Sequence, residues 1–65
     1  MTHEQLWYVA LGRQLRAART ERGMTIYDVA AVVDSTGNAV SLWERGLRRM
    51  KAWQYAILRA EGLVR

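Results

Sequence analysis

A chain of 65 residues, half of them hydrophobic, can bury one modest core, so we expect a single domain over residues 1–65. The absence of cysteine excludes disulfides and a cysteine-based zinc site, and the single histidine, His3, excludes a histidine cluster. The formal net charge of +4 favours a polyanionic partner.

The chain contains no proline and no long alternation of apolar and polar residues, so an all-α fold is expected. A first helix is predicted over about residues 3–22, because Thr2 and Gln5 have capping-box spacing and Gly23 is a natural stop. Its expected apolar stripe consists of Trp7, Tyr8, Leu11, Leu15 and Ala18.

Two short helices are predicted next, over residues 26–33 and 37–44, with Thr25 and Thr36 as their N-caps. Asp34 and Ser35 form the connection between them. The inner face of the second of these helices is expected to consist of Ala39, Val40 and Trp43. Two short helices joined by a tight turn and braced by a longer helix are the parts of a helix-turn-helix.

A fourth helix is predicted over about residues 50–60, and Gly62 closes it. Its expected buried residues are Trp53, Ala56, Ile57 and Ala60. The apolar residues Leu63 and Val64 can fold back onto the core.

The outer face of helix 37–44 suits the major groove of DNA. Asn38 can bond two edge atoms of adenine, Ser41 can bond a base or a phosphate, and Leu42 can touch a thymine methyl. Gly37 would let the start of the helix approach the DNA closely. These four residues are the predicted base-reading set.

A second set of residues is predicted to hold DNA phosphates. The amides that follow Thr36 at a helix N-terminus suit an anion. A basic cluster with one nearby acid follows, and it indicates contacts to the DNA backbone. The predicted phosphate set is Thr36, Arg45, Arg48, Arg49 and Lys51.

Other charged residues are expected to have structural roles. Arg19 lies at the edge of the first apolar stripe and Glu44 beside Val40, so we predict a partly buried ion pair between Arg19 and Glu44. Arg13 and Arg16 lie outside the stripe and are expected to be solvated.

The sequence from Leu11 to Val64 resembles the Cro/C1 (XRE-type) helix-turn-helix family. The resemblance is carried by the segments LGRQLRAARTERGMT, DVAAVVDSTGNAVSLWERG and AEGLV. The positions that match the family pattern are Arg19, Gly23, Ala30, Val40, Glu44 and Gly46. It implies a compact four- to five-helix fold of the lambda-repressor-like kind. It also implies that Gly37, Asn38, Ser41 and Leu42 occupy base-reading positions, with Thr36 and Arg45 near phosphates.

We therefore expect a sequence-specific regulator of transcription that binds double-stranded DNA, most simply a small Cro-like phage repressor in the host cytoplasm. A small bacterial regulator or an antitoxin is equally compatible with the sequence. No cofactor, small-molecule ligand or membrane contact is expected, and catalysis has little support because the single histidine lies at the chain end.

A palindromic operator and a homodimer, assembled on DNA, would double the few base contacts of one domain. The candidate dimer residues are Leu6, Leu58, Leu63 and Val64.

Two other functions compete with this one. A protein-binding adaptor is indicated by the apolar run from Leu6 to Leu11, which wraps around a helix so that Leu6 and Val9 should point outwards. A MerR- or excisionase-like domain is indicated by the segments IYDVA and WERGL. It ranks lower, because in that family the two motifs open the domain and a wing follows them.

Overall fold

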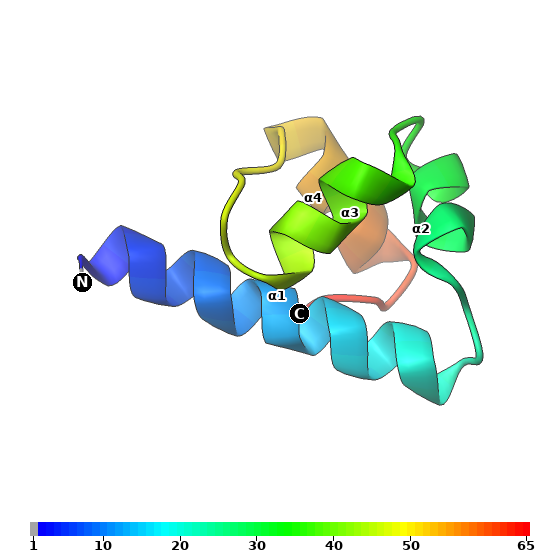
Figure 1. Cartoon of the computed structure of the whole chain (residues 1–65), viewed down its shortest axis with the longest axis horizontal. Coiled ribbons are helices and arrows are strands. Elements are labelled where there is room, and N and C mark those ends of the chain that lie inside the picture. Colours follow the sequence, from blue (N-terminus) through cyan, green and yellow to red (C-terminus); the bar gives the residue numbers. More distant parts are fainter. Residues whose placement is uncertain (1) are drawn as a thin grey trace.

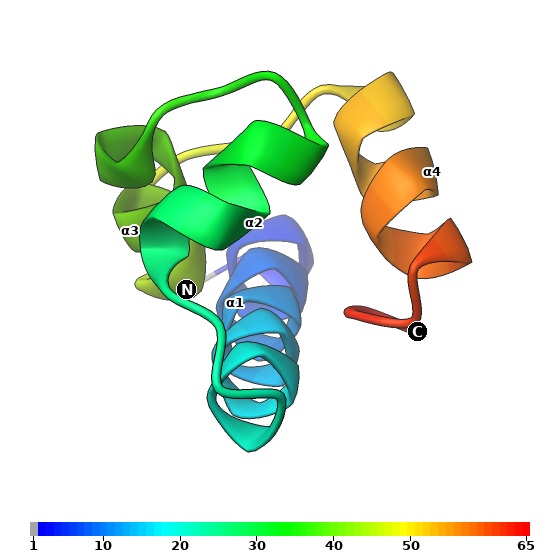
Figure 2. The same cartoon turned by 90° about the vertical axis from the view of Figure 1, so that its right-hand side faces the viewer.

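The computed structural model describes residues 2–65, which form four helices and no strand. The helices are α1 (His3–Glu21), α2 (Ile26–Val32), α3 (Gly37–Glu44) and α4 (Ala52–Ala60). Figure 1 shows α1 as a long rod, with the three shorter helices gathered over its C-terminal part. In a view along α1, α3 and α4 lie on opposite flanks, with α2 between them (Figure 2). The predicted all-α fold is confirmed.

The first three helices begin where threonine can cap them, which is why their starts were predictable from the sequence. The hydroxyls of Thr2, Thr25 and Thr36 accept hydrogen bonds from the backbone amides three residues later, at 3.1 Å in each case. The bounds of α3 are those predicted, whereas α1 and α2 each end one residue earlier than expected.

A single core joins all four helices. Its buried hydrophobic residues are Leu11, Leu15, Val29, Ala30, Val33, Ala39, Val40, Trp43, Leu58, Leu63 and Val64. The inner face predicted for α3 is therefore correct, since Ala39, Val40 and Trp43 are all buried. Because a helix fixes the faces of its residues, burial of these three turns the opposite side of α3 outwards.

The buried face predicted for α4 is wrong except at Ile57, which is partly buried against the core. The helix buries Gln54 and Leu58, whereas Trp53 is 47% exposed and Ala56 and Ala60 also face solvent. The helix begins at Ala52, and the Gln54 Oε1 atom accepts a hydrogen bond from the Lys51 amide at 2.9 Å. A buried glutamine with its acceptor satisfied costs little, so Gln54 and Leu58, four residues apart, can form the inner stripe.

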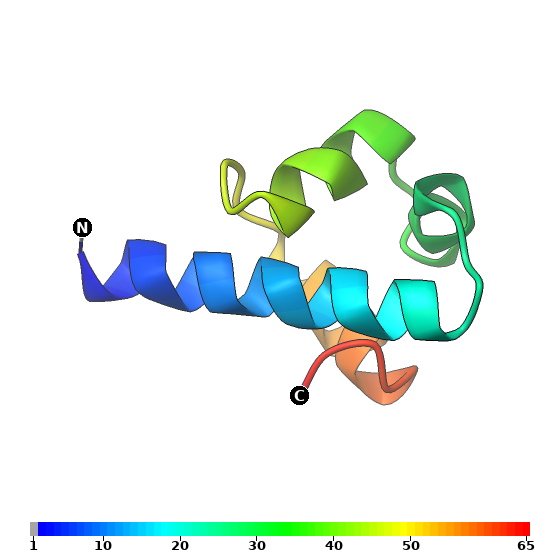
Figure 3. The ribbon, with the colours of Figure 1, turned by 60° about the horizontal axis from the view of Figure 1, so that its bottom comes forward.

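The C-terminal segment folds back across α1 (Figure 3). The Arg65 amide donates to Gln14 Oε1 at 3.1 Å, and the Tyr55 hydroxyl donates to the Arg65 carbonyl at 2.8 Å. Leu63 and Val64 are buried by this fold-back, as predicted. Their burial, together with that of Leu58, corrects the expectation that these three residues are free for a dimer interface.

The N-terminal turns of α1 extend past the rest of the domain (Figure 1) and leave apolar side chains in solvent. Leu6 is 52% exposed and Trp7 is 47% exposed, so Trp7 is not part of the buried stripe. The Trp7 ring still touches aromatic neighbours, with centroid distances of 4.9 Å to Tyr8 and 5.7 Å to Tyr55. No helix in residues 2–65 is long and apolar enough to cross a membrane.

Candidate nucleic-acid interface

The two short helices α2 and α3 are joined by a tight turn that fixes their relative orientation. The Ser35 amide donates to the Ala30 carbonyl at 2.9 Å, which closes the end of α2. Asp34 adopts a left-handed conformation with φ of 51°, a region that favours glycine. The turn is therefore closed by a backbone hydrogen bond and carries a small backbone strain at Asp34.

The outer face of α3 presents most of the predicted base-reading residues. Asn38 and Arg45 are exposed, and Ser41 and Leu42 are partly exposed. Asn38 lies in the first turn of the helix and Arg45 is its C-cap, so the face runs along the whole helix. Amide, hydroxyl and aliphatic groups are thus arranged on one face that could enter a groove.

Gly37, also predicted to be base-reading, is not exposed on this face. It is buried at the start of α3 beneath Tyr27 of α2. A Cβ atom at Gly37 would lie 2.6 Å from Tyr27 Cε1 and 2.7 Å from Tyr27 Cδ1. The glycine therefore makes room for an aromatic ring of the same domain. The local sequence predicts that Gly37 begins α3, but it does not show that Tyr27 of α2 packs against it.

Four of the five predicted phosphate residues line one groove. The groove has a volume of about 450 Å³ and lies between the α2–α3 turn and the segment that follows α3. The four residues that it shares with the prediction are Thr36, Arg48, Arg49 and Lys51. Arg45 is exposed but lies outside this groove. Asp34, predicted in the connection between the two short helices, and Trp53, predicted in the core, also line it.

The basic residues of the groove differ in their partners. Arg49 forms an ion pair with Glu4 of α1, and its guanidinium lies 5.8 Å from the centroid of the Tyr8 ring. Both charged side chains are largely exposed, so the pair is weak in water. Arg48 and Lys51 have no ion-pair partner within residues 2–65. The charge of Arg49 is therefore partly offset by Glu4, whereas those of Arg48 and Lys51 are not.

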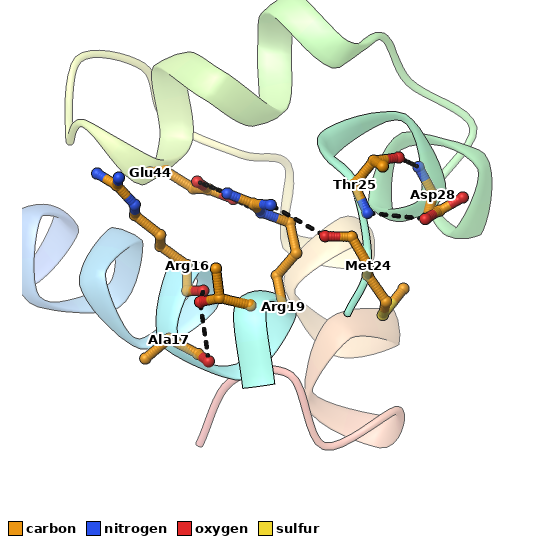
Figure 4. Close-up of polar contacts among 8 residues, drawn as sticks. Arg16, Ala17, Arg19, Met24, Thr25, Asp28 and Glu44 are labelled. Carbon is orange, nitrogen blue, oxygen red and sulfur yellow. Dashed lines mark hydrogen bonds and ion pairs between the residues drawn. The ribbon is translucent and has the colours of Figure 1, made fainter. Parts of the chain in front are cut away.

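The predicted Arg19–Glu44 ion pair is present and ties α3 to α1 (Figure 4). Arg19 Nε donates to Glu44 Oε2 at 2.7 Å, and its Nη2 donates to Glu44 Oε1 at 3.0 Å. Its Nη1 also donates to the Met24 carbonyl, at 3.0 Å. The side chains are only 15% and 7% exposed, and the hydrogen bonds to Glu44 raise the pKa of Arg19 above its ordinary value.

A close approach of backbones at Gly12 also positions α3, and the sequence analysis missed it. A Cβ atom at Gly12 would lie 2.7 Å from the Glu44 carbonyl oxygen and even closer to that of Trp43. Only glycine lets α1 come this near to the end of α3. A glycine inside a predicted helix was the available signal.

A comparison with protein-family models places residues 15–51, which are more than half of the chain, in a family described as helix-turn-helix. The chain belongs to this Cro/C1-type (XRE-type) helix-turn-helix family. The matched segment includes all of α2 and α3 and the basic segment after them. The family consists of DNA-binding regulators, so double-stranded DNA is the partner of this domain.

No curated protein and no solved structure gave a significant match in the corresponding comparisons. The family match and the fold together rank the MerR- or excisionase-like alternative lower still. A helix precedes the two motifs and another follows them, and residues 2–65 contain no strand that could form a wing.

Proposed function

We propose that this helix-turn-helix protein is a repressor that reads a specific operator in the major groove with α3. The observation that carries the proposal is the division of α3 into two faces. Ala39, Val40 and Trp43 are buried, while Asn38 is exposed in the first turn. In helix-turn-helix proteins the N-terminal residues of the second helix reach the base edges, which is the position that Asn38 has here.

The chemistry of this face supports direct readout of a few base pairs. The Asn38 amide can donate to N7 of adenine and accept from its N6 amino group at the same time, and this bidentate pair discriminates against other bases. Ser41 and Leu42 follow on the same side and suit a polar base edge and a thymine methyl respectively. Gly37 has no part in this readout, because Tyr27 covers it.

Affinity would come from the basic groove next to α3. Arg48 and Lys51 are exposed cations on its wall, and Thr36 can still donate its hydroxyl proton while its oxygen accepts from the Ala39 amide. Arg45 extends the positive surface at the end of α3. Such contacts to phosphates position a protein on DNA without selecting its sequence.

A palindromic operator and a dimer formed on DNA complete the proposal, because one domain contacts too few base pairs for useful specificity. Leu58, Leu63 and Val64 cannot form the interface, since all three are buried in the core. Of the residues first considered, Leu6 remains available, and the exposed Trp7 ring is next to it.

Selection of bound duplexes from a random pool tests this function. We expect a palindromic consensus whose half-sites lie about one helical turn apart. A reporter gene with the selected operator across its promoter should then be silenced by the protein. Recovery of sequences with no consensus, or activation of the reporter, would contradict the proposal.

A protein-binding adaptor is a second candidate, favoured by the half-exposed Leu6 and Trp7 side chains at the free end of α1. Val9 does not share this exposure, because it packs against Gly46. A titration with random duplex at low salt separates the two functions. Absence of any binding under these conditions would favour the adaptor, whereas salt-sensitive binding favours the regulator.

A further inference from the structure

Tyr27 is a large exposed side chain beside α3 to which the proposed function gives no role. It is the second residue of α2 and is 71% exposed, more than Leu6, Trp7 or Trp53. Its hydroxyl makes no hydrogen bond within residues 2–65, whereas that of Tyr55 donates to the Arg65 carbonyl. Tyr27 therefore offers an aromatic ring and a free hydroxyl to a partner.

Packing on Gly37 fixes the position of this ring. The nearest ring atoms, Cε1 and Cδ1, would meet any Cβ atom at Gly37, and Ile26 Cδ1 would lie 3.5 Å from the same Cβ atom. Gly37 is buried even though it is the first residue of α3. One edge of the ring thus lies against Gly37, the residue before Asn38 in the chain, while most of the Tyr27 side chain is in solvent.

The charges around Tyr27 leave its hydroxyl open to an anion. The only acid in the same helix turn, Asp28, turns back to accept a hydrogen bond from the Thr25 amide at 2.7 Å. Figure 4 shows this carboxylate directed at the cap of α2. Neighbouring residues on a helix do not face each other, so Asp28 does not occupy the side on which Tyr27 lies.

We propose that Tyr27 is a DNA-positioning residue whose hydroxyl donates a hydrogen bond to the phosphate that flanks the base pair read by Asn38. The inference rests on the proposed function, that is, on insertion of α3 into the major groove. In that arrangement the first helix of the pair crosses the DNA backbone. A residue of α2 that leans on the first residue of α3 then lies at the boundary between base edges and backbone.

The chemistry of tyrosine gives this contact a distinctive signature. A phenol hydroxyl is neutral, so its bond to a phosphate releases no counterion and leaves the salt dependence of binding unchanged. The contact also carries no base specificity. Gly37 then has a purpose in the interface even though it is buried, because any side chain there would displace the Tyr27 ring.

Tyr27→Phe in the full chain tests the contact, since it removes the hydroxyl and keeps the ring on Gly37. We expect the Kd for selected and random duplexes to rise equally, by about 3- to 10-fold, with the salt slope of wild type. A second probe is DNA in which a neutral methylphosphonate replaces one phosphate at a time. At one position in each half-site, this replacement should weaken DNA binding by wild type but cause no further loss of affinity in Tyr27→Phe. An unchanged Kd for Tyr27→Phe would overturn the inference, as would equal losses for both proteins at every position.

Tyr55→Phe is the matched control, because it removes a tyrosine hydroxyl that bonds the Arg65 carbonyl and should leave the Kd for DNA unchanged. The melting temperature of Tyr27→Phe should equal that of wild type, since the lost hydroxyl has no partner in the domain. Failure of the wild-type protein to bind any duplex would overturn the proposed function and this inference together. Normal binding by wild type and by Tyr27→Phe would overturn the inference alone.

Discussion

At the scale of single residues, Arg19 is the side chain on which the placement of α3 depends most. Its guanidinium donates two hydrogen bonds to the Glu44 carboxylate, at 2.7 and 3.0 Å, and one to the Met24 carbonyl oxygen, at 3.0 Å. Arg19→Ala would leave the Glu44 carboxylate, which is 7% exposed, without its partner. We expect a loss of about 3–5 kcal/mol in the free energy of unfolding, a large part of the stability of so small a domain.

Thermal denaturation followed by circular dichroism measures this loss, and Arg13→Ala on the exposed side of α1 is the control. An Arg19→Ala protein that melts with wild type would contradict the account. The raised pKa of Arg19 also fixes the sign of the pH dependence. Its contribution is complete below the ordinary pKa of arginine and is lost only as the pH rises through the raised value. Mildly alkaline pH should therefore leave the Arg19 contribution intact.

Asp34 is the residue at which stability and DNA affinity can be separated. A φ of 51° strains the backbone of a residue that has a Cβ atom but not that of glycine. We therefore expect Asp34→Gly to stabilise the domain by about 0.5–1 kcal/mol. The same change removes a carboxylate from the basic groove and should also tighten DNA binding. Asp34→Asn is the matched control, because asparagine loses the charge yet tolerates the left-handed region. It should gain affinity with little change in melting temperature. Destabilisation by Asp34→Gly would show that the strain argument is wrong.

At the scale of helices, the contact between α1 and α3 depends on a position without a side chain. Helix propensity alone predicts that Gly12→Ala stabilises α1 by up to about 1 kcal/mol. The structure predicts the opposite sign, because the added Cβ would meet the Glu44 carbonyl oxygen at 2.7 Å. We expect a loss of about 1–3 kcal/mol in the free energy of unfolding, measured by urea denaturation. A stabilised Gly12→Ala protein would mean that α1 and α3 are further apart than described.

The starts of the helices with strong caps were predictable from the sequence, whereas α4 was predicted to start at about residue 50 and begins at Ala52. Thr25 and Thr36 fixed the starts of α2 and α3, and the apolar spacing of Ala39, Val40 and Trp43 fixed the inner face of α3. The start of α4 has no such side-chain cap at Lys51.

Two different faces of α4 also fit the helical period, and one of them includes the polar residue Gln54. The predicted stripe contained Trp53, but the real one contains Gln54 and Leu58. Only the core, which is built from distant segments, decides between them. The burial of Gly37 was unpredictable for the same reason, because it depends on contact with a distant residue. That residue is Tyr27, ten positions earlier, and no local sequence pattern places its ring against Gly37.

At the scale of the whole molecule, the net charge of +4 should contribute to DNA affinity through the cations that line the groove after α3. These cations are Arg48, Arg49 and Lys51. Neutralising Arg48 or Lys51 should weaken binding to all duplexes alike and lower the salt slope of log Kd by about 1. Arg49→Ala should have a smaller effect, because Arg49 is already paired with Glu4. The salt dependence of Kd, measured for the three alanine variants, checks this order. A variant that altered the preferred base at one position would show that its residue reads bases instead.

The most direct test of the central claim, that α3 reads DNA through its exposed face, is the ratio of operator affinity to random-duplex affinity for Asn38→Ala. The variant changes an exposed residue, so its melting temperature should match that of wild type. We predict that the ratio falls by about 5- to 150-fold for each lost adenine contact, equivalent to about 1–3 kcal/mol, while the random-duplex Kd is unchanged. A ratio equal to that of wild type would contradict the account.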